Sequence, residues 1–566
     1  MRAIITDRDA LLRVQVPELE QYLKRNGWRL SVTTPKATLW TLEHSAGEQF
    51  EIELPLNSKV RDYPIRVSEI FQTLDTVEGR SQLDIFNELQ LAGISAQAVA
   101  APMRSASTVL GLPLFTWCLL IISALIAGFV GASIFYAQFS FQSALRPPTG
   151  GSGQSAVNWN INTWAMISTV LSLLAIFPGL TSLYAGLVRR KNALSVIAQC
   201  WGIMGVVTII WCFLGYGLVF NTGGSMIGNP CGIFSASGSA LSSAYEPGIS
   251  AQLFPIHQMM FAILAGLIIL GAVAERMKFV AILLFMALWV IAVFCPIAHM
   301  MWASDGFMNG IANRNATIRA IDFSGGAVVQ MTGGWSGLIL CLILGPRLGF
   351  GKGSMPPHNM VLVVLGTGLL WVGWYGFTAG RTFGSVDVAV NAFSATTLAA
   401  IIGGFVWATM EFIFRGKSSV LGFCSGTLAG LVVVTPACGF VTTRGAVLVG
   451  LAAGVIPFLA CLKLKACLGY DDALDSFGIH GVGGMLGVLM TGLLADGVTN
   501  PTIGALVNGL FLQQLLATVV TLLWSVVGTL LIAYMVKAAV GLRPSMHDEV
   551  AGLDLVEHGE EGYHGS

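Results

Sequence analysis

Charged residues are scarce in this sequence. Asp, Glu, Lys and Arg make up 11% of the 566 residues, whereas soluble globular domains contain about a quarter. Hydrophobic residues make up 54%. This composition excludes an ordinary soluble domain for most of the chain and predicts a polytopic membrane protein. The formal net charge is zero, so no excess of basic residues favours a nucleic-acid partner.

Metal-binding and redox cysteine patterns are also missing. The ten cysteines form no CxxC pair and show no zinc-ligand spacing, and most of them lie inside apolar runs, where small core residues are expected. We therefore expect no metal site and no cofactor. No nucleophile–base pair stands out, so we expect no enzymatic activity. No signal peptide is expected, because the first residues are charged and the first apolar run lies past residue 105.

Apolar segments long enough to span a bilayer are abundant. Leu110 to Phe139 has no charged residue, and 144–160 is rich in Pro, Gly and Ser. Eleven further apolar segments follow, at 163–187, 194–220, 253–274, 278–302, 323–345, 359–380, 391–414, 420–437, 443–467, 477–494 and 510–538. The predicted parts are a soluble domain at 1–105, an extra transmembrane helix at 106–140, a linker at 141–160, a helical core at 161–540 and a tail at 541–566.

The first hundred residues predict a small α+β domain. Leu11 to Trp28 has the periodicity of an amphipathic helix. Three stretches at 28–34, 38–43 and 49–56 alternate like strands, and Asp62 to Leu91 favours one or two helices. This domain holds no catalytic constellation, and the sequence predicts no function for it.

The distribution of Lys and Arg between loops predicts the orientation of the helices. Alternate loops carry clusters of these residues, whereas the opposite loops carry only Arg314, Arg319, Arg381 and Arg444, and 221–252 carries neither. The clustered loops are therefore expected in the cytoplasm. This orientation places the N-terminal domain and the acidic tail in the cytoplasm and the 141–160 linker outside the cell.

Two helical segments share one unusual pattern. Gln330 is followed by glycines three, four and seven positions later, and so is His480. Each segment has an aspartate upstream, Asp322 or Asp475. Glycines at this spacing let two backbones come close, and an imidazole in an apolar helix points to a functional site. Because the segments lie on the fifth and tenth helices of the core, the two five-helix halves should be inverted repeats, a common plan among transporters.

The core resembles the ammonium transporter family (Amt/Mep/Rh) over about seven tenths of the chain. The resemblance rests on collinear motifs, among them Tyr184-Ala-Gly-Leu-Val-Arg-Arg-Lys-Asn192, Pro296-Ile-Ala-His-Met-Met-Trp302, Asp322-Phe-Ser-Gly-Gly-Ala-Val-Val, Gly373-Trp-Tyr-Gly-Phe377 and Asp475-Ser-Phe-Gly-Ile-His-Gly-Val-Gly-Gly484. It implies an all-α polytopic fold with an eleven-helix inverted-repeat (5+5+1) core and one pore in each protomer of a homotrimer. It also implies that a PII-type signal protein docks at the cytoplasmic face.

The physical problem for such a protein is to move a small cation through hydrocarbon, where bare ammonium would lose hydration worth on the order of tens of kcal/mol. Aromatic faces lower this cost through cation–π attraction of about 0.5–2 kcal/mol. By resemblance, Trp302 and Trp374 belong to an outer vestibule that recruits the ion. Phe261 and Phe377 resemble the stacked phenyl gate below it.

The resemblance assigns the remaining roles to polar residues. His480 matches a pore histidine, which can relay a proton or hydrogen-bond ammonia. Asp322 is expected to act through the fold and the electric field, with Asp475 as its counterpart in the second half. Gln330 stands where the other pore histidine is expected, and an amide does not exchange a proton near neutral pH. A relay between two imidazoles is therefore excluded.

Two further residues depart from the family pattern. Arg381 stands where a small, often hydroxyl-bearing residue is expected. If it points inward, it repels ammonium by roughly 3–4 kcal/mol at about 4–6 Å or lies on Trp302 as a tethered cation. Alternatively, it extends into water or pairs with Asp387. His257, four residues before Phe261, is either a second titratable group at the entrance or a polar replacement in the vestibule wall.

Two functions follow as hypotheses. The first is transport of ammonium or ammonia across the plasma membrane, with Trp302, the phenyl pair and His480 as the working residues. The second is a non-conducting ammonium sensor, in which Arg381 and Gln330 disable conduction and the N-terminal domain signals.

Overall fold

The computed structural model describes residues 16–34, 37–43, 49–56, 63–80, 159–230, 248–352 and 355–563, together with a few isolated positions among them. The chain divides into two compact units, Met1–Pro113 and Leu114–Ser566. The predicted extra helix at 110–139 falls, apart from Leu112–Pro113, outside the described residues. Most of the predicted linker does so too.

The first unit is an α+β domain, as expected from its alternating stretches. Helices α2 (Val16–Arg25) and α3 (Tyr63–Glu78) accompany a three-stranded antiparallel sheet. Its strands, in the order β1-β2-β3, are Arg29–Thr33, Ala37–Glu43 and Gln49–Pro55. The buried side chains include Leu23, Trp40, Leu54 and Phe71. Two short strands, β4 (Thr108–Val109) and β5 (Leu112–Pro113), pair with each other.

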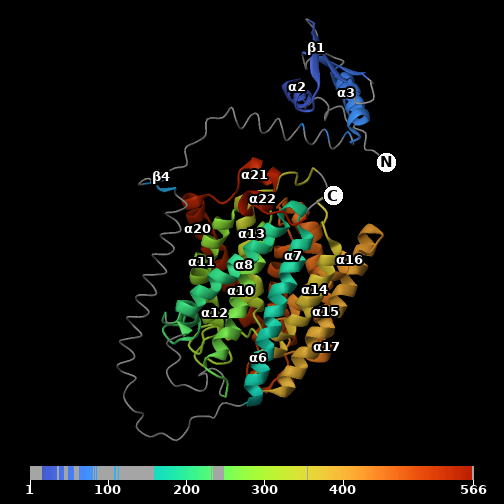
Figure 1. Cartoon of the computed structure of the whole chain (residues 1–566). Coiled ribbons are helices and arrows are strands. Elements are labelled where there is room, and N and C mark those ends of the chain that lie inside the picture. Colours follow the sequence, from blue (N-terminus) through green and yellow to red (C-terminus); the bar gives the residue numbers. More distant parts are fainter. Residues whose placement is uncertain are drawn as a thin grey trace. The chain divides into compact units, whose positions relative to one another are not determined.

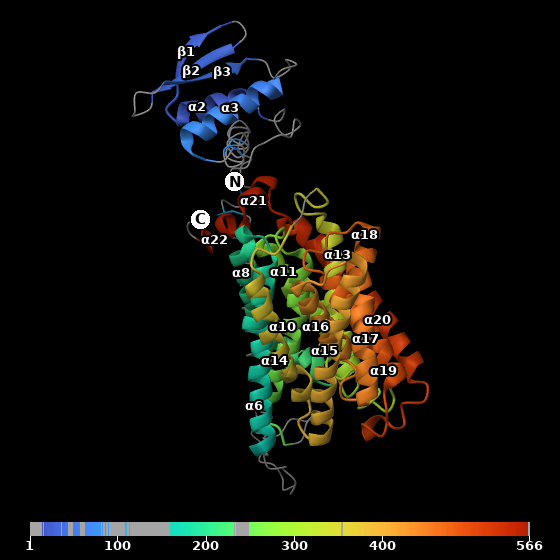
Figure 2. The ribbon, with the colours of Figure 1, turned by 90° about the vertical axis from the view of Figure 1, so that its right-hand side faces the viewer.

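The second unit is a bundle of long apolar helices that lie alongside one another (Figures 1 and 2). Several predicted spans consist of consecutive helical segments with π-helical turns between them. The elements are α6 (Trp159–Leu174), η1 (Ala175–Leu180), α7 (Thr181–Leu187), η2 (Arg190–Asn192), α8 (Ala193–Ile210), η3 (Trp211–Gly215), α9 (Tyr216–Phe220), α10 (Leu253–Val273), α11 (Phe279–Trp289), η5 (Val290–Phe294), α12 (Cys295–Trp302), η6 (Gly326–Met331), α13 (Thr332–Leu344), α14 (Met360–Phe377), η7 (Ala379–Arg381), α15 (Val386–Arg415), α16 (Val420–Val434), α17 (Thr443–Leu459), η8 (Ala460–Leu464), α18 (Lys465–Leu468), η9 (Phe477–Val482), α19 (Gly483–Leu494), η10 (Pro501–Ile503) and α20 (Leu510–Val540).

Each of the eleven apolar segments predicted for the core contains helix. Among the described residues, ten helices are long and apolar enough to cross a membrane, and Val420–Val434 is a shorter apolar helix. The chain is therefore a multi-pass, all-α membrane protein with a small additional domain.

The two helices that carry the repeated glycine pattern cross so closely that their backbones are in contact. A Cβ atom on Gly334 would lie 2.1 Å from the backbone nitrogen of Gly481, and one on Gly484 would lie 2.8 Å from that of Met331. Both distances are far inside van der Waals contact, so only glycine permits this approach. Each of the two crossing helices begins with a π-helical segment, η6 or η9, which contains the polar residue of the pattern.

A buried ionic network ties together four of the connecting loops. Arg347 donates to Glu275 at 2.6 Å and to both carboxylate oxygens of Asp471, at 2.8 and 2.9 Å. Arg189 also donates to Glu275, at 2.8 Å. Although burial opposes ionisation, Arg189 and Arg347 hold the pKa of Glu275 below its ordinary value. Glu275 is thus ionised near neutral pH, and its contacts with the two arginines stabilise the network.

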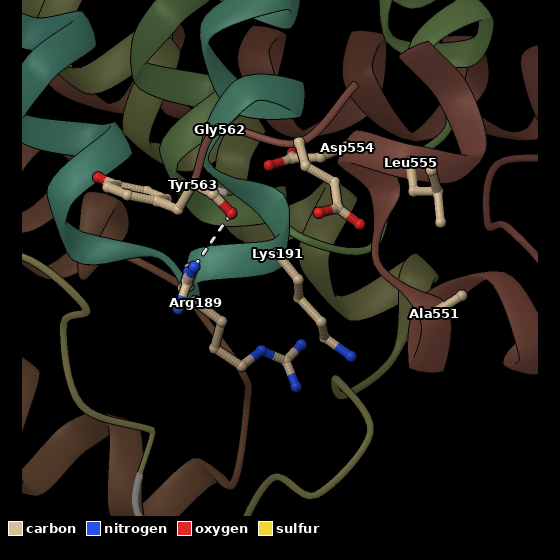
Figure 3. Close-up of a pocket in the computed structure, with 9 residues that line it drawn as sticks. Arg189, Lys191, Ala551, Asp554, Leu555, Gly562 and Tyr563 are labelled. Atoms are coloured by element: carbon tan, nitrogen blue, oxygen red, sulfur yellow. Dashed lines mark hydrogen bonds between the residues drawn. The ribbon is translucent and has the colours of Figure 1, made fainter. Parts of the chain in front are cut away.

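The tail packs against this end of the bundle through α21 (Met546–Ala551) and α22 (Leu553–His558). Asp554 accepts from the backbone N–H groups of Leu194 and Ser195 at the start of α8. A cavity of about 440 Å³ lies between the tail and the loop at 189–191, and Figure 3 shows residues that line it. Arg190 donates to the backbone oxygen of Tyr563 at 3.0 Å. The tail is therefore held by specific polar contacts.

The glycine crossing yields a first prediction. Gly334→Ala should prevent native packing, because its Cβ would require the two helices to separate by more than about 1 Å, and overpacking of a close core costs about 1–3 kcal/mol or more. Gly368→Ala is the matched control, because a Cβ there meets no atom within 4 Å. The thermal unfolding midpoint of the purified protein should fall for the first variant only. An equal effect of both variants would contradict the role given to the crossing.

The ionic network yields a second prediction. Arg347→Ala leaves Glu275 and Asp471 as buried carboxylates with fewer partners, which typically costs about 3–5 kcal/mol. Lys352→Ala, in the same loop but exposed, should change the unfolding midpoint little. Because the folded-state pKa of Glu275 is depressed, its contribution is present above the ordinary carboxyl pKa and is lost as the pH falls through the folded-state value. Acid should therefore destabilise the wild-type protein more than the Arg347→Ala variant.

Candidate functional site

An open cavity of about 580 Å³ lies at one end of the bundle, among the loops around α12 and α15. Trp302, Arg381, Gln258 and Asp322 are among the residues that line it. Trp302 ends α12, and its indole N–H donates to the backbone oxygen of Asp322 at 3.0 Å. The cavity is thus an aromatic vestibule whose indole ring is fixed by the backbone beside it.

A line of aromatic rings leads from Trp302 into the bundle. The Trp302 and Phe261 ring centroids are 5.5 Å apart, and those of Phe261 and Phe377 are 5.0 Å apart. The phenyl rings meet edge to face at 79°, not stacked as expected. Trp374 is buried beside Phe377 and donates to Thr435 at 3.2 Å. Its place is therefore in the packing behind the phenyl pair and not in the cavity wall that the structure describes.

The structure brings Gln330 and His480 together in the buried core. The Nδ1 atom of His480 lies 2.7 Å from the Oε1 atom of Gln330. Because an amide oxygen only accepts, His480 donates its Nδ1 proton to it, and in the neutral imidazole the lone pair is then on Nε2. The Nε2 atom of Gln330 is buried without a partner among the described residues. His480 also lines a second cavity, of about 240 Å³, with Tyr184, Ser476 and others.

Asp322 caps the first helix of the pair. Its two carboxylate oxygens accept four backbone N–H groups, from Gly325 to Val328, at 2.7–3.1 Å. Burial raises the pKa of Asp322, and the four donors oppose that shift. With its acceptor positions used in this way, the carboxylate stabilises the start of this helix.

In the second half the corresponding cap is Asp472, not Asp475 as predicted. Asp472 accepts from the backbone N–H groups of Ser476 and Phe477 at 3.1 and 2.7 Å. Asp475 instead has a positive φ of 58° and bonds Lys465 at 2.7 Å. The equivalent of Asp475 in the first half is Gly325, with a φ of 95°. Both residues start their helix from the left-handed region, which Gly adopts readily and Asp tolerates.

Arg381 points into the vestibule. Its Cζ atom lies 4.3 Å from the centroid of the Trp302 ring and 5.3 Å from that of Phe261. Its Nη1 atom donates to Gln258 Oε1 at 3.0 Å. Of the alternatives open from the sequence, this geometry is that of a tethered cation on the aromatic faces.

His257 is fully buried beside the vestibule. It packs edge to face on Phe261 and Phe383, and its Nδ1 atom lies 3.2 Å from Thr169 Oγ1. Gln258, the next residue, is the polar side chain of α10 that faces the cavity. The sequence analysis missed Gln258, although its spacing of three residues from Phe261 places it on the same helical face.

The fold and the site together define the class of this protein. It is a multi-pass helical membrane protein with an aromatic vestibule and a buried amide–imidazole pair. Residues 163–563 match the model of the Ammonium Transporter Family. A putative ammonium transporter of Methanothermobacter thermautotrophicus is 39% identical over 415 residues, which cover 72% of this chain and 99% of that protein. Ammonium transporter Amt1 of Archaeoglobus fulgidus is 38% identical, over 71% of this chain and 98% of that protein. The chain therefore belongs to the Ammonium Transporter Family.

Solved structures agree with this assignment. The crystal structure of Saccharomyces cerevisiae Mep2 gives a TM-score of 0.62 at 31% identity and covers 69% of this chain and 89% of Mep2. A protein described as a sensor Amt protein gives a TM-score of 0.63 at 27% identity, over 70% of this chain and 98% of that one. The relatives named as ammonium transporters support ammonium transport as the general function.

The cap assignment yields a third prediction. Asp472→Ala leaves the N–H groups of Ser476 and Phe477 without their acceptor and should cost about 1–3 kcal/mol of stability. Asp475→Asn removes only a partly exposed ion pair and should cost less than about 1 kcal/mol. Thermal unfolding of the two purified variants compares them directly. A larger loss of stability for Asp475→Asn would show that Asp475, and not Asp472, caps the helix.

Asp472 also has a pH signature. Burial raises its pKa from 3.8 to about 6, against the opposing charge of Lys465. A carboxyl whose folded-state pKa is raised favours the folded state most when protonated, so its contribution declines as the pH rises from about 4 to about 6. The unfolding midpoint of Asp472→Asn should lack this component of the wild-type pH dependence. Identical pH profiles for the two proteins would contradict it.

Proposed function

We propose that this protein moves ammonium or ammonia across the plasma membrane through a pore within each protomer. The single observation that carries the proposal is the line of rings from Trp302 through Phe261 to Phe377. We propose that the Gln330–His480 pair lies further along the same pore. In this proposal Trp302 recruits the cation by its π face, and the phenyl pair forms the gate below.

Below the gate, the polar pair favours the neutral species. The unpartnered Nε2–H group of Gln330 can donate to the lone pair of ammonia, whereas ammonium has no lone pair to accept it. Gln330 cannot exchange a proton, so His480 is the only titratable member of the pair. Asp322 and Asp472 contribute by holding the starts of the two helices through their backbone hydrogen bonds.

We place the vestibule outside the cell and the tail and N-terminal domain in the cytoplasm, on the loop distribution of Lys and Arg. The protein is proposed to be a homotrimer in lipid, like the family it belongs to. The ordered tail surface supports docking of a PII-type signal protein there.

A second function is favoured by one observation, the position of Arg381. With its guanidinium 4.3 Å from the centre of the Trp302 ring, an ammonium ion at about 4–6 Å would be repelled by roughly 3–4 kcal/mol at an effective dielectric constant of 20. This repulsion supports a non-conducting sensor, in which occupancy of the vestibule is reported by the N-terminal domain.

Uptake of labelled methylammonium, by cells that lack other ammonium transporters, separates the two functions and is our fourth prediction. Saturable uptake by the wild-type chain is expected for a transporter and would rule out the sensor. Arg381→Ser should raise uptake by about tenfold or more, because the repulsion is removed. Arg444→Ser, at an exposed arginine near the start of α17, is the matched control.

If the wild-type chain takes up nothing, the double variant Arg381→Ser with Gln330→His decides the cause. Restored uptake would show that these side chains block conduction in an otherwise competent pore. Absence of uptake in both proteins, at equal membrane levels, would contradict transport.

A further inference from the structure

The guanidinium of Arg381 occupies a cation site that the protein builds for itself. It lies on the faces of two aromatic rings, Trp302 and Phe261, and donates to the amide oxygen of Gln258. Gln258 is 2% exposed, so its oxygen is available only from the cavity side. The site thus combines π faces with one neutral acceptor, which is what any small organic or inorganic ammonium-type cation requires.

The backbone that carries Arg381 is fixed. The turn η7 is buried at Ala379 and Gly380, and a Cβ on Gly380 would lie 2.5 Å from the Cβ of Ser168 on α6. The turn therefore cannot shift toward α6 or admit a larger residue at its centre. In contrast, the side chain of Arg381 is long and borders a cavity of about 580 Å³, so rotation about its own bonds can remove the guanidinium from the rings.

We propose that Arg381 is a tethered competitor of ammonium for the face of Trp302, and that Gln258 sets how firmly the competitor is held. The inference rests on the proposed function, since it takes ammonium as the ligand. Two cations cannot share the site because they repel each other, so ammonium binds only when the guanidinium has left. Displacement is then a side-chain movement on a fixed turn.

This arrangement gives Gln258 two opposing roles. Its oxygen holds Arg381 in place, which weakens ammonium binding, and it also accepts from ammonium once Arg381 has left. The hydrogen bonds that a charged acceptor forms are about twice as strong as those of a neutral acceptor. Gln258→Glu should therefore weaken ammonium binding when Arg381 is present and strengthen it when Arg381 is absent. Such a reversal of sign is a coupling that a double-mutant cycle measures.

The test, our fifth prediction, uses the purified full-length chain in lipid nanodiscs. Its thermal unfolding midpoint is followed as ammonium chloride replaces sodium chloride at constant ionic strength, since a ligand of the folded state raises the midpoint according to its affinity. Arg381→Ser should bind ammonium about tenfold tighter than wild type, and Arg444→Ser should bind as wild type does. Gln258→Glu should bind about tenfold weaker in the wild-type background and tighter in the Arg381→Ser background.

An effect of Gln258→Glu with the same sign in both backgrounds would overturn the proposal. A second measurement does not depend on the buried glutamate folding correctly. Methylguanidinium at low millimolar concentration should stabilise Arg381→Ser and compete with ammonium there, because it replaces the missing guanidinium, and should leave the wild type unchanged. Equal effects of methylguanidinium on both proteins, or no effect on Arg381→Ser, would also overturn the proposal.

These measurements report binding and not flux. The wild-type chain could transport no methylammonium while the effect of Gln258→Glu still reverses sign between the two backgrounds. In that case the transport proposal fails and the proposal that Arg381 competes with ammonium is supported. If transport is observed without the reversal, the competitor fails and the transport proposal stands.

Discussion

The close crossing of α13 and α19 is the constraint on which the centre of this protein depends. Gly334 and Gly484 allow each helix to touch the backbone of the other, and each lies four residues after the polar member of its segment. One helical turn separates positions i and i+4, so the glycines that set the approach also deliver Gln330 and His480 to 2.7 Å from each other. The same four-residue spacing therefore sets the close approach of the helices and the contact between Gln330 and His480.

Much of this could be predicted from the sequence because the signals are local. The eleven core spans follow from the length of apolar runs, and the crossing follows from glycines at repeated intervals. The counterpart of Asp322 was misassigned, although the signal was present: Asp322 lies eight residues before Gln330, and Asp472 lies eight residues before His480. The prediction chose Asp475, which holds the position of Gly325. Measuring each repeat from its central polar residue identifies the cap.

The conformation of the vestibule could not be predicted in this way. The partner of Arg381, Gln258, is 123 positions away in the sequence, and the two rings that receive the guanidinium come from α10 and α12. Whether a long cationic side chain lies inward or outward depends on its contacts with all of these surfaces together. A local sequence pattern does not contain that information. For the same reason His257 could be placed on the face of Phe261 from its spacing, whereas its burial against Phe383 comes from a loop far along the chain.

Gln330 and Arg381, two of the three departures from the family pattern, lie at different sites, and the fold explains why both are tolerated. The start of each crossing helix is held by a buried aspartate and the crossing by glycine, so an imidazole at position 330 is not needed for stability. Glutamine keeps the hydrogen bond to His480 and fixes which ring nitrogen carries the proton, while removing one titratable group from the core. Arg381, on η7, adds a permanent charge at the vestibule. The chain thus keeps the scaffold of its family while changing the charge beside the Trp302 ring and the number of titratable groups in the core.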